Sequence, residues 1–265
     1  MVSETNDQAE RHRLIVLGAS NVAKSLDVLL RVAPRMISKP LEVYAAIGRG
    51  RSYGTQSQFL FRRLPGILES ELWPTLESRA NSAKTSCVIT DIGNDLLYSR
   101  TVDQIIAWLE QCIIRLRLTA GPIAITGIPL AGIRTLAPYK FRTLRSLMFP
   151  GSTLELTTVQ QRAEELNVRV QALAQDDDIT FIPQNPEWYG FDPIHWKPRK
   201  RPEVWHTILA SLGHSSFDYT RVRSTFMHEI KHWMTRPHQR TLFGLKQSKQ
   251  QPVIQRGEQL TVALY

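Results

Sequence analysis

The chain of 265 residues is 42% hydrophobic and carries 33 Lys and Arg against 24 Asp and Glu, a formal net charge of +9. Residues 1–195 hold 21 basic and 20 acidic side chains, whereas residues 196–265 hold 12 and 4, so the positive excess lies in the C-terminal part. This composition excludes a disordered, collagen-like or disulfide-rich chain, and the nearly neutral body argues against a protein devoted throughout to nucleic acid.

The predicted elements alternate between short apolar runs and longer amphipathic segments, after a polar stretch over 1–12 that we expect to be flexible. Apolar runs that end at Gly or Pro are typical of buried strands, and they occupy residues 13–18, 41–48, 86–93, 122–128 and 178–183. Apolar residues at helical spacing predict helices at 21–32, 55–64, 101–118, 157–175 and 202–213. Residues 129–153 contain Pro and Gly, and we expect an irregular excursion over one end of a sheet.

This alternation of strands and helices implies a parallel sheet covered on both faces, a doubly wound α/β domain over residues 13–213. We expect residues 214–265 to form a basic extension with a helical patch at about 220–235 and a hairpin around Gly257. Cationic and aromatic side chains alternate there and would suit an acidic partner, an anionic surface or RNA. They are Arg221, Arg223, Phe226, Lys231, Trp233, Arg236, His238 and Arg240.

The two cysteines, Cys87 and Cys112, lie in apolar stretches, which predicts buried free thiols and leaves no Cys-based zinc site. The N-terminal residues have no apolar signal-peptide core, and no stretch approaches the roughly 18 apolar residues of a membrane span. We therefore expect a soluble, cytoplasmic protein.

Glycine and polar residues follow four of the predicted strands, and they are GASN at 18–21, GRGRS at 48–52, GND at 93–95 and DPIH at 192–195. Because ligands bind at the carboxyl ends of the strands in an open α/β sheet, these segments should converge on one edge. A serine, a glycine backbone, an amide side chain and an Asp/His pair are the groups that acyl transfer needs.

In this order, the four blocks resemble those of the SGNH (GDSL-type) hydrolase family. The resemblance implies the fold of that family, a flavodoxin-like doubly wound parallel sheet of about five strands. The resemblance implies that Ser20 is the nucleophile, that His195 is the general base, and that Asp192 orients the imidazole. Ala19 stands where the family has the aspartate of its GDS motif, and this departure leaves the subfamily open.

The resemblance also implies an oxyanion hole. Its donors would be the backbone N–H of Ser20, the backbone N–H of Gly50 and the side-chain amide of Asn94, with Gly48 as the alternative glycine. We therefore expect a serine esterase or acylhydrolase that acts on a small ester-bearing substrate and needs no metal or cofactor.

Arg49 and Arg51 lie beside the expected oxyanion site, which favours a substrate with an acidic acyl or alcohol group. The alternative function is a catalytically degenerate scaffold of the same fold, which binds an acidic partner through the basic C-terminal segment.

Two further motifs compete with this interpretation. Ser52 lies in the G-x-S-x-G pattern of 50–54, but α/β-hydrolases place that nucleophile several strands into the sheet, and one strand precedes this one. Residues 228–232 match H-E-x-x-H, and with Glu258 as a third ligand they would make a zinc hydrolase. The lysine within the motif and the basic surroundings favour a solvated helix face there.

Overall fold

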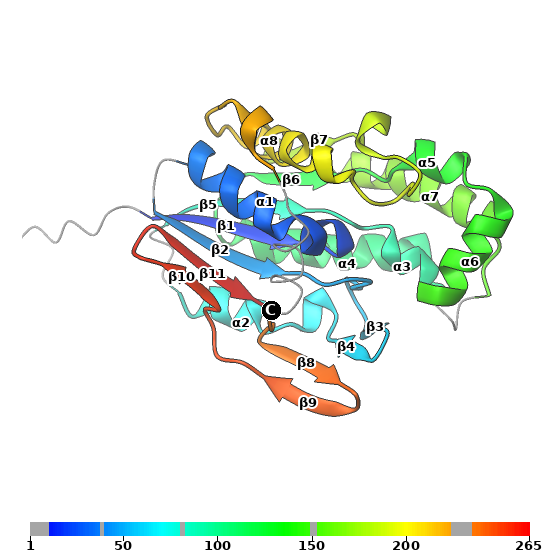
Figure 1. The fold of residues 1–265 in the computed structure, drawn as a ribbon, viewed down its shortest axis with the longest axis horizontal. Coiled ribbons are helices and arrows are strands. Elements are labelled where there is room, and N and C mark those ends of the chain that lie inside the picture. The colour runs from blue at the N-terminus through cyan, green and yellow to red at the C-terminus, as the bar shows by residue number, and fades with distance from the viewer. Residues whose placement is uncertain (1–10, 38–39, 80–82, 149–152, 224–234) are drawn as a thin grey trace, which may run out of the picture.

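A seven-stranded sheet forms the centre of the molecule, in the order β10-β11-β2-β1-β5-β6-β7 (Figure 1). The computed structural model describes residues 11–37, 40–79, 83–148, 153–223 and 235–265. The sheet consists of β1 (His12–Leu17), β2 (Leu41–Ala46), β5 (Lys84–Ile89), β6 (Ile123–Thr126), β7 (Ile179–Ile182), β10 (Ile254–Arg256) and β11 (Leu260–Leu264). The helices are α1 (Ser20–Met36), α2 (Leu72–Glu77), α3 (Asn94–Leu97), α4 (Val102–Arg117), α5 (Leu130–Arg134), α6 (Pro138–Met148), α7 (Leu156–Leu173) and α8 (Arg201–Ser211).

The five predicted strands are all present, and in chain order they lie 2-1-3-4-5 across the sheet, the flavodoxin-like doubly wound arrangement. They pair in parallel, and the order reverses between β1 and β5. The C-terminal part of the chain adds two strands, because β11 pairs in parallel with β2 and β10 pairs antiparallel with β11. A ligand crevice is expected where the strand order reverses, at the ends of β1 and β5.

Side chains of β1 alternate between two cores, which explains why the strand is continuously apolar. Leu14 and Val16 pack with α1 and α8 on one face of the sheet. Ile15 and Leu17 pack with α2, α4 and α7 on the other face. All four side chains are fully buried, as expected for a parallel strand with helices on both sides.

A second, four-stranded antiparallel sheet lies beside the first, in the order β3-β4-β8-β9. It consists of β3 (Ser57–Phe59), β4 (Arg62–Leu64), β8 (Gln239–Leu242) and β9 (Leu245–Ser248). The prediction of a helix at 55–64 is therefore wrong, since this segment turns at Leu60 and Phe61. Its apolar residues were compatible with a helix, but β4 pairs with β8, a strand from the other end of the chain.

One more expectation was wrong in detail, and another is confirmed. Residues 129–153 are not irregular throughout, because they form α5 and α6. The predicted hairpin is confirmed as β10 and β11, with Gly257 at a φ of 56° in its turn. Most of the predicted basic helix at 220–235 lies outside the described residues.

Cys87 and Cys112 are buried and free, as predicted. In the described part of the chain, no helix has the length and apolarity to cross a membrane.

Candidate active site

Ser20 is the first residue of α1 and lies just beyond the carboxyl end of β1. The connection from strand to helix is tight because Gly18 has no side chain. A Cβ at Gly18 would lie 2.5 Å from Cγ2 of Val22 and 2.9 Å from Cγ2 of Thr90. Gly18 therefore lets the first turn of α1 pack directly on the end of β5, at the point where the strand order reverses.

Asp91, which follows β5, caps the N-terminus of α1. Its carboxylate accepts hydrogen bonds from the backbone N–H of Ala19 at 2.8 Å and of Asn21 at 2.9 Å. Asp91 has a φ of 62°, in the left-handed region. A serine at this position could cap the helix, but here the carboxylate of Asp91 does so. The Ser20 hydroxyl is not used for capping. The sequence analysis missed Asp91. The feature that could have indicated it is its position just after β5, the strand that pairs with β1.

The side chain of Asn21 connects the start of α1 to the backbone on both sides of His195. Asn21 Nδ2 donates to the carbonyl of Ile194 at 3.0 Å, and Asn21 Oδ1 accepts from the backbone N–H of Trp196 at 2.8 Å. Nδ2 also donates to Asp91 at 2.7 Å. Since Asn21 is adjacent to Ser20, this bracket holds the His195 segment against the start of the helix that carries the serine.

His195 and Asp192 form the predicted pair. Nδ1 of His195 lies 2.6 Å from Oδ2 of Asp192, and the Ile194 backbone N–H donates to the other carboxylate oxygen at 3.2 Å. Burial raises the pKa of the Asp192 carboxyl, but the His195 hydrogen bond and the charges of His195 and Lys24 outweigh it, so the pKa lies below its ordinary value. His195 is 9% exposed, and its Nε2 is buried without a hydrogen-bond partner among the described residues.

The groups expected to bind the oxyanion come from two neighbouring segments. Asn94 begins α3, and its Nδ2 donates to the carbonyl of Arg51 at 3.4 Å, which leaves its second N–H for another acceptor. The hydroxyl of Tyr98 donates to the carbonyl of Gly50 at 2.7 Å, and Gly50 has a φ of 68°. These bonds join the turn at 48–51 to α3.

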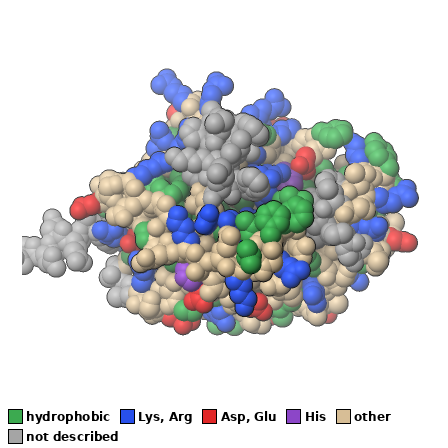
Figure 2. All heavy atoms as spheres, turned by 60° about the horizontal axis from the view of Figure 1, so that its bottom comes forward, with side chains coloured by type: hydrophobic (Ala, Val, Ile, Leu, Met, Phe, Trp, Pro, Cys, Tyr) green, Lys and Arg blue, Asp and Glu red, His purple; other side chains and the backbone are tan. Residues whose placement is uncertain are grey.

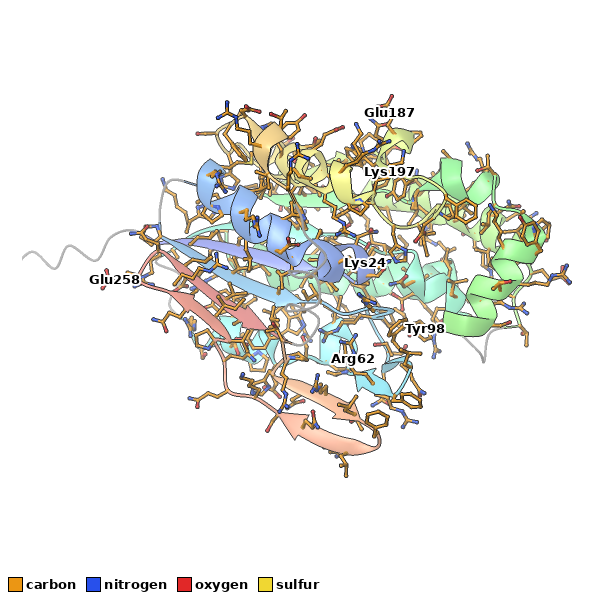
Figure 3. The ribbon with its side chains drawn as sticks, viewed as in Figure 1. Lys24, Arg62, Tyr98, Glu187, Lys197 and Glu258 are labelled. Carbon is orange, nitrogen blue, oxygen red and sulfur yellow. The ribbon has the colours of Figure 1, made fainter. Side chains whose placement is uncertain are left out.

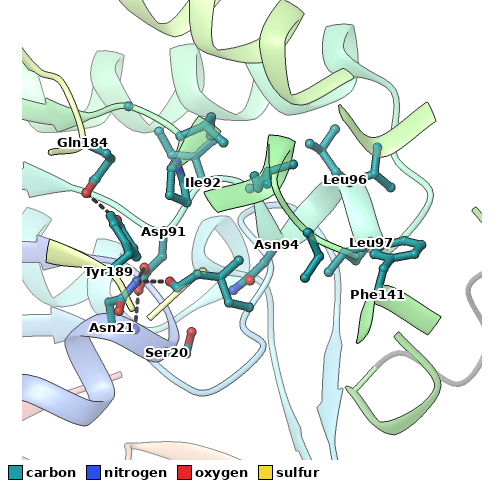
Figure 4. A pocket seen from close by; sticks show the side chains of 18 of the residues that line it. Ser20, Asn21, Asp91, Ile92, Asn94, Leu96, Leu97, Phe141, Gln184 and Tyr189 are labelled. Atoms are coloured by element: carbon teal, nitrogen blue, oxygen red, sulfur yellow. Dashed lines mark hydrogen bonds between the residues drawn. The ribbon is translucent and has the colours of Figure 1, made fainter. Parts of the chain in front are cut away.

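Ser20 and Asn94 line a pocket of about 100 Å³ at this edge of the sheet (Figure 4). Asn21 and Asp91 lie beside Ser20, while apolar side chains of α3 and α6 lie beyond Asn94 (Figure 4). Gly48 and Gly50 are not among the lining residues that the described part of the chain supplies. Most of the lining side chains are apolar, and they include Ile92, Leu96, Leu97, Ile128, Pro129, Ile133, Leu136, Phe141, Leu156 and Val159.

Arg51 does not face this pocket, so the expectation that it selects an acidic substrate is wrong. Its guanidinium is fully buried and donates to the backbone carbonyls of Ile47, Pro65 and Tyr265. Burial and the charge of Arg62 lower its pKa to about 9. Arg51 is a structural residue that fixes the segment after β2, and the glycine-rich sequence around it gave no sign of this role.

The competing nucleophile, Ser52, is also fully buried. Its hydroxyl donates to Asp95 and accepts from the backbone N–H of Thr55 at 3.0 Å. Gly54 of the same motif packs against Trp108, and a Cβ there would lie 2.0 Å from the indole ring. The G-x-S-x-G pattern therefore describes a packed turn rather than an exposed nucleophile elbow.

The H-E-x-x-H motif at 228–232 lies outside the described residues. Glu258, its suggested third ligand, lies in the turn between β10 and β11. Figure 3 labels it at the opposite end of the sheet from Tyr98, which binds the turn beside Asn94.

No protein-family model and no curated protein sequence matches the chain. Several solved structures are similar in fold. A lipolytic protein of the G-D-S-L family from Veillonella parvula is 13% identical, with a TM-score of 0.46, over 80% of this chain and 100% of that one. A carbohydrate acetylesterase family member from Sinorhizobium meliloti is 13% identical, with a TM-score of 0.48, over 76% and 97%. The psychrotrophic esterase EstA from Pseudoalteromonas sp. is 11% identical, with a TM-score of 0.44, over 76% and 95%.

Proposed function

We propose that the chain is a serine esterase or acylhydrolase that works through an acyl-enzyme on Ser20. The observation that carries the proposal is the bracket of Asn21, which holds His195 against the residue that follows Ser20. His195 is bound to Asp192 through Nδ1, and its buried Nε2 has no partner among the described residues. In a serine hydrolase the general base is a histidine that a carboxylate holds through one ring nitrogen, which leaves the other nitrogen for the serine hydroxyl.

In the proposed reaction, Ser20 Oγ attacks the carbonyl carbon of an ester while its proton passes to Nε2 of His195. Asp192 stabilises the imidazolium, which suits a carboxyl whose pKa is held below its ordinary value. Collapse of the tetrahedral intermediate expels the alcohol, which takes the proton from His195. Water then attacks the acyl-enzyme, with His195 as base, and releases the carboxylic acid and Ser20.

The developing oxyanion would be bound by the backbone N–H of Ser20, the side-chain amide of Asn94 and the backbone N–H of Gly50. Asn94 lines the pocket together with Ser20, and Gly50 lies in the turn that the Tyr98 hydroxyl joins to α3. The loss of one such donor typically lowers kcat by about 10²–10³. Most of the pocket lining is apolar, which suits the acyl part of the substrate, so we expect esters of fatty acids to be substrates.

The test is mass spectrometry of the intact protein and its peptides after treatment with a fluorophosphonate, which labels only an activated serine. We expect a label on Ser20 in the wild type and in Ser52→Ala, and no label in Ser20→Ala. His195→Ala should label at least 10³-fold more slowly, because the base is missing.

Each other outcome contradicts the proposal in a distinct way. A label on Ser52 would move the nucleophile to the second block. A folded wild type that carries no label on any serine would favour the degenerate scaffold, which binds an acidic partner through the basic C-terminal segment.

A further inference from the structure

The two hairpins of the small sheet carry exposed apolar side chains at their tips. Leu60 and Phe61 form the turn between β3 and β4 and are 56% and 65% exposed. Phe243 lies in the turn between β8 and β9 and is 69% exposed, and Leu245 follows it. The rings of Phe61 and Phe243 stack with their centroids 4.9 Å apart, so the two tips form one patch, which we call the tip patch.

The backbone of these turns makes the apolar side chains unusual. Leu60 has a φ of 54° and Phe243 a φ of 49°, in the left-handed region that Gly and Asn adopt at least cost. In a two-residue hairpin turn such as Phe243-Gly244, Asn is the residue most favoured at the first position. Bulky apolar residues are therefore present at exposed sites where local folding favours a small polar one.

The two segments that carry the tip patch hold basic residues and no acidic ones. Residues 55–66 and 236–249 hold six Lys and Arg and no Asp or Glu. Arg63 and Arg240 donate hydrogen bonds to the neutral amides of Gln58 and Gln247, and neither guanidinium has an ion pair with a carboxylate in the described part of the chain. Burial and the charges of Arg240 and Arg49 lower the pKa of Arg62 to about 10, as expected where cations gather.

Some of these cations lie together in a cleft of about 410 Å³ on the hairpin pair, lined by Arg63, Arg240 and Lys246. Figure 2, in which the β8–β9 side of the molecule comes forward, shows a hydrophobic cluster with Lys and Arg side chains around it. The patch lies on the side of the molecule where β1 and β2 end (Figure 1). Tyr98, whose hydroxyl binds Gly50, lies above Arg62 and the β3–β4 hairpin in Figure 3.

We propose that the tip patch and the cations around it dock the protein on an anionic lipid bilayer. Leu60, Phe61 and Phe243 would enter the interface between headgroups and acyl chains, while Arg63, Arg240 and Lys246 bind lipid phosphates. Exposed aromatic and aliphatic side chains with Lys and Arg beside them are the combination that binds such surfaces. The proposal goes beyond ester hydrolysis and does not depend on it.

The test is co-sedimentation of the full chain with phosphatidylcholine vesicles and with vesicles of equal parts phosphatidylcholine and phosphatidylglycerol. We expect binding to the anionic vesicles alone, weakened by salt. The tip variant, Leu60→Asn with Phe243→Asn, should bind at least tenfold more weakly, because the apolar anchors are lost. Its Tm should not fall, since Asn suits the left-handed backbone of both turns.

A charge variant, Arg63→Gln with Lys246→Gln, should bind about 25-fold more weakly, at roughly fivefold for each cation near an anionic surface. Val168→Gln removes an equally exposed apolar side chain from α7 and should bind as the wild type does. Failure to bind anionic vesicles would overturn the proposal. The proposal would also be overturned if the tip variant bound anionic vesicles as well as the wild type does and polyglutamate abolished that binding. Such a result would indicate an acidic protein as the partner.

Discussion

Replacement of Asn21 with alanine removes the side chain that brackets His195. Three hydrogen bonds disappear, and they join Asn21 to Ile194, Trp196 and Asp91. We expect a protein that is folded but less stable, in which the segment around His195 is no longer held at the start of α1.

The expected size of the effect follows from these three bonds. Neutral hydrogen bonds each contribute about 0.5–1.5 kcal/mol, and one to a charged group about 1.5–3 kcal/mol. The bonds from Asn21 to Asp91 and Ile194 are partly buried and the bond from Trp196 is buried, so we expect the free energy of unfolding to fall by about 2–4 kcal/mol. That corresponds to a fall in Tm of roughly 5–12 °C for a domain of this size. A base displaced by about 1 Å should slow reaction at Ser20 by about 10².

The assay combines urea unfolding with the rate of fluorophosphonate labelling as a function of pH. The labelling rate of Asn21→Ala should fall at every pH, although His195 and Asp192 remain paired. Asn185→Ala is the matched control. Asn185 also accepts a backbone hydrogen bond, from Glu187, and its side chain has no hydrogen bond to residues 192–196 in the described part of the chain. It should lose about 1 kcal/mol of stability and label at the wild-type rate.

Two results would refute this reasoning. Wild-type labelling in a destabilised Asn21→Ala protein would show that the bracket supports the fold without positioning the base. Wild-type labelling together with wild-type stability would mean that the three hydrogen bonds contribute nothing in solution.

Three further predictions concern the residues around the site. Asp91→Ala should lower the free energy of unfolding by about 1–2 kcal/mol in a urea titration, because α1 loses its cap, and Asp91→Asn should lose less. Burial raises the pKa of Asp95 to about 6, above its unfolded value of 3.8, so its contribution to stability is greatest below pH 3.8 and decreases as the pH rises to about 6. That step, about 3 kcal/mol, should be seen in urea titrations across this range and be absent in Asp95→Asn; a wild type without it would contradict the assignment. Gly54→Ala should lower the Tm by several degrees, at a cost of about 1–3 kcal/mol, because its Cβ would overlap the ring of Trp108. An unchanged Tm would show that the turn yields without strain.

The sequence predicted the elements whose information is local. The central strands β1, β2, β5, β6 and β7 were found because each is a short apolar run that ends at a turn. The long helices α1, α4, α7 and α8 were found from their apolar spacing. The β3–β4 hairpin was missed because its pairing partner, β8, comes from the far end of the chain, and no local pattern encodes such a contact.

The same distinction separates the site residues that were predicted from those that were missed. Asp192 and His195 are three residues apart, so their pairing could be inferred from one short block, and the structure pairs them. Asn21 and Asp91 act on backbone groups of remote segments, and an Asn or Asp beside a turn has many simpler uses. Arg51 was assigned to the substrate because its sequence position says nothing about whether its side chain points into the pocket or into the core.

The parallel pairing of β11 with β2 has a consequence for the order of folding. During synthesis, β2 emerges more than 200 residues before Leu260 can pair with Leu41. Until then β2 is an edge strand with unpaired backbone groups, the kind of edge that recruits other chains. Arg51, in the turn after β2, likewise can donate its hydrogen bond to the carbonyl of Tyr265 only after the last residue has been added. The segment beside the candidate site therefore reaches its final packing only when residues 260–265 have been synthesised. For most of the synthesis of the chain, the edge of β2 is open to pairing with other chains.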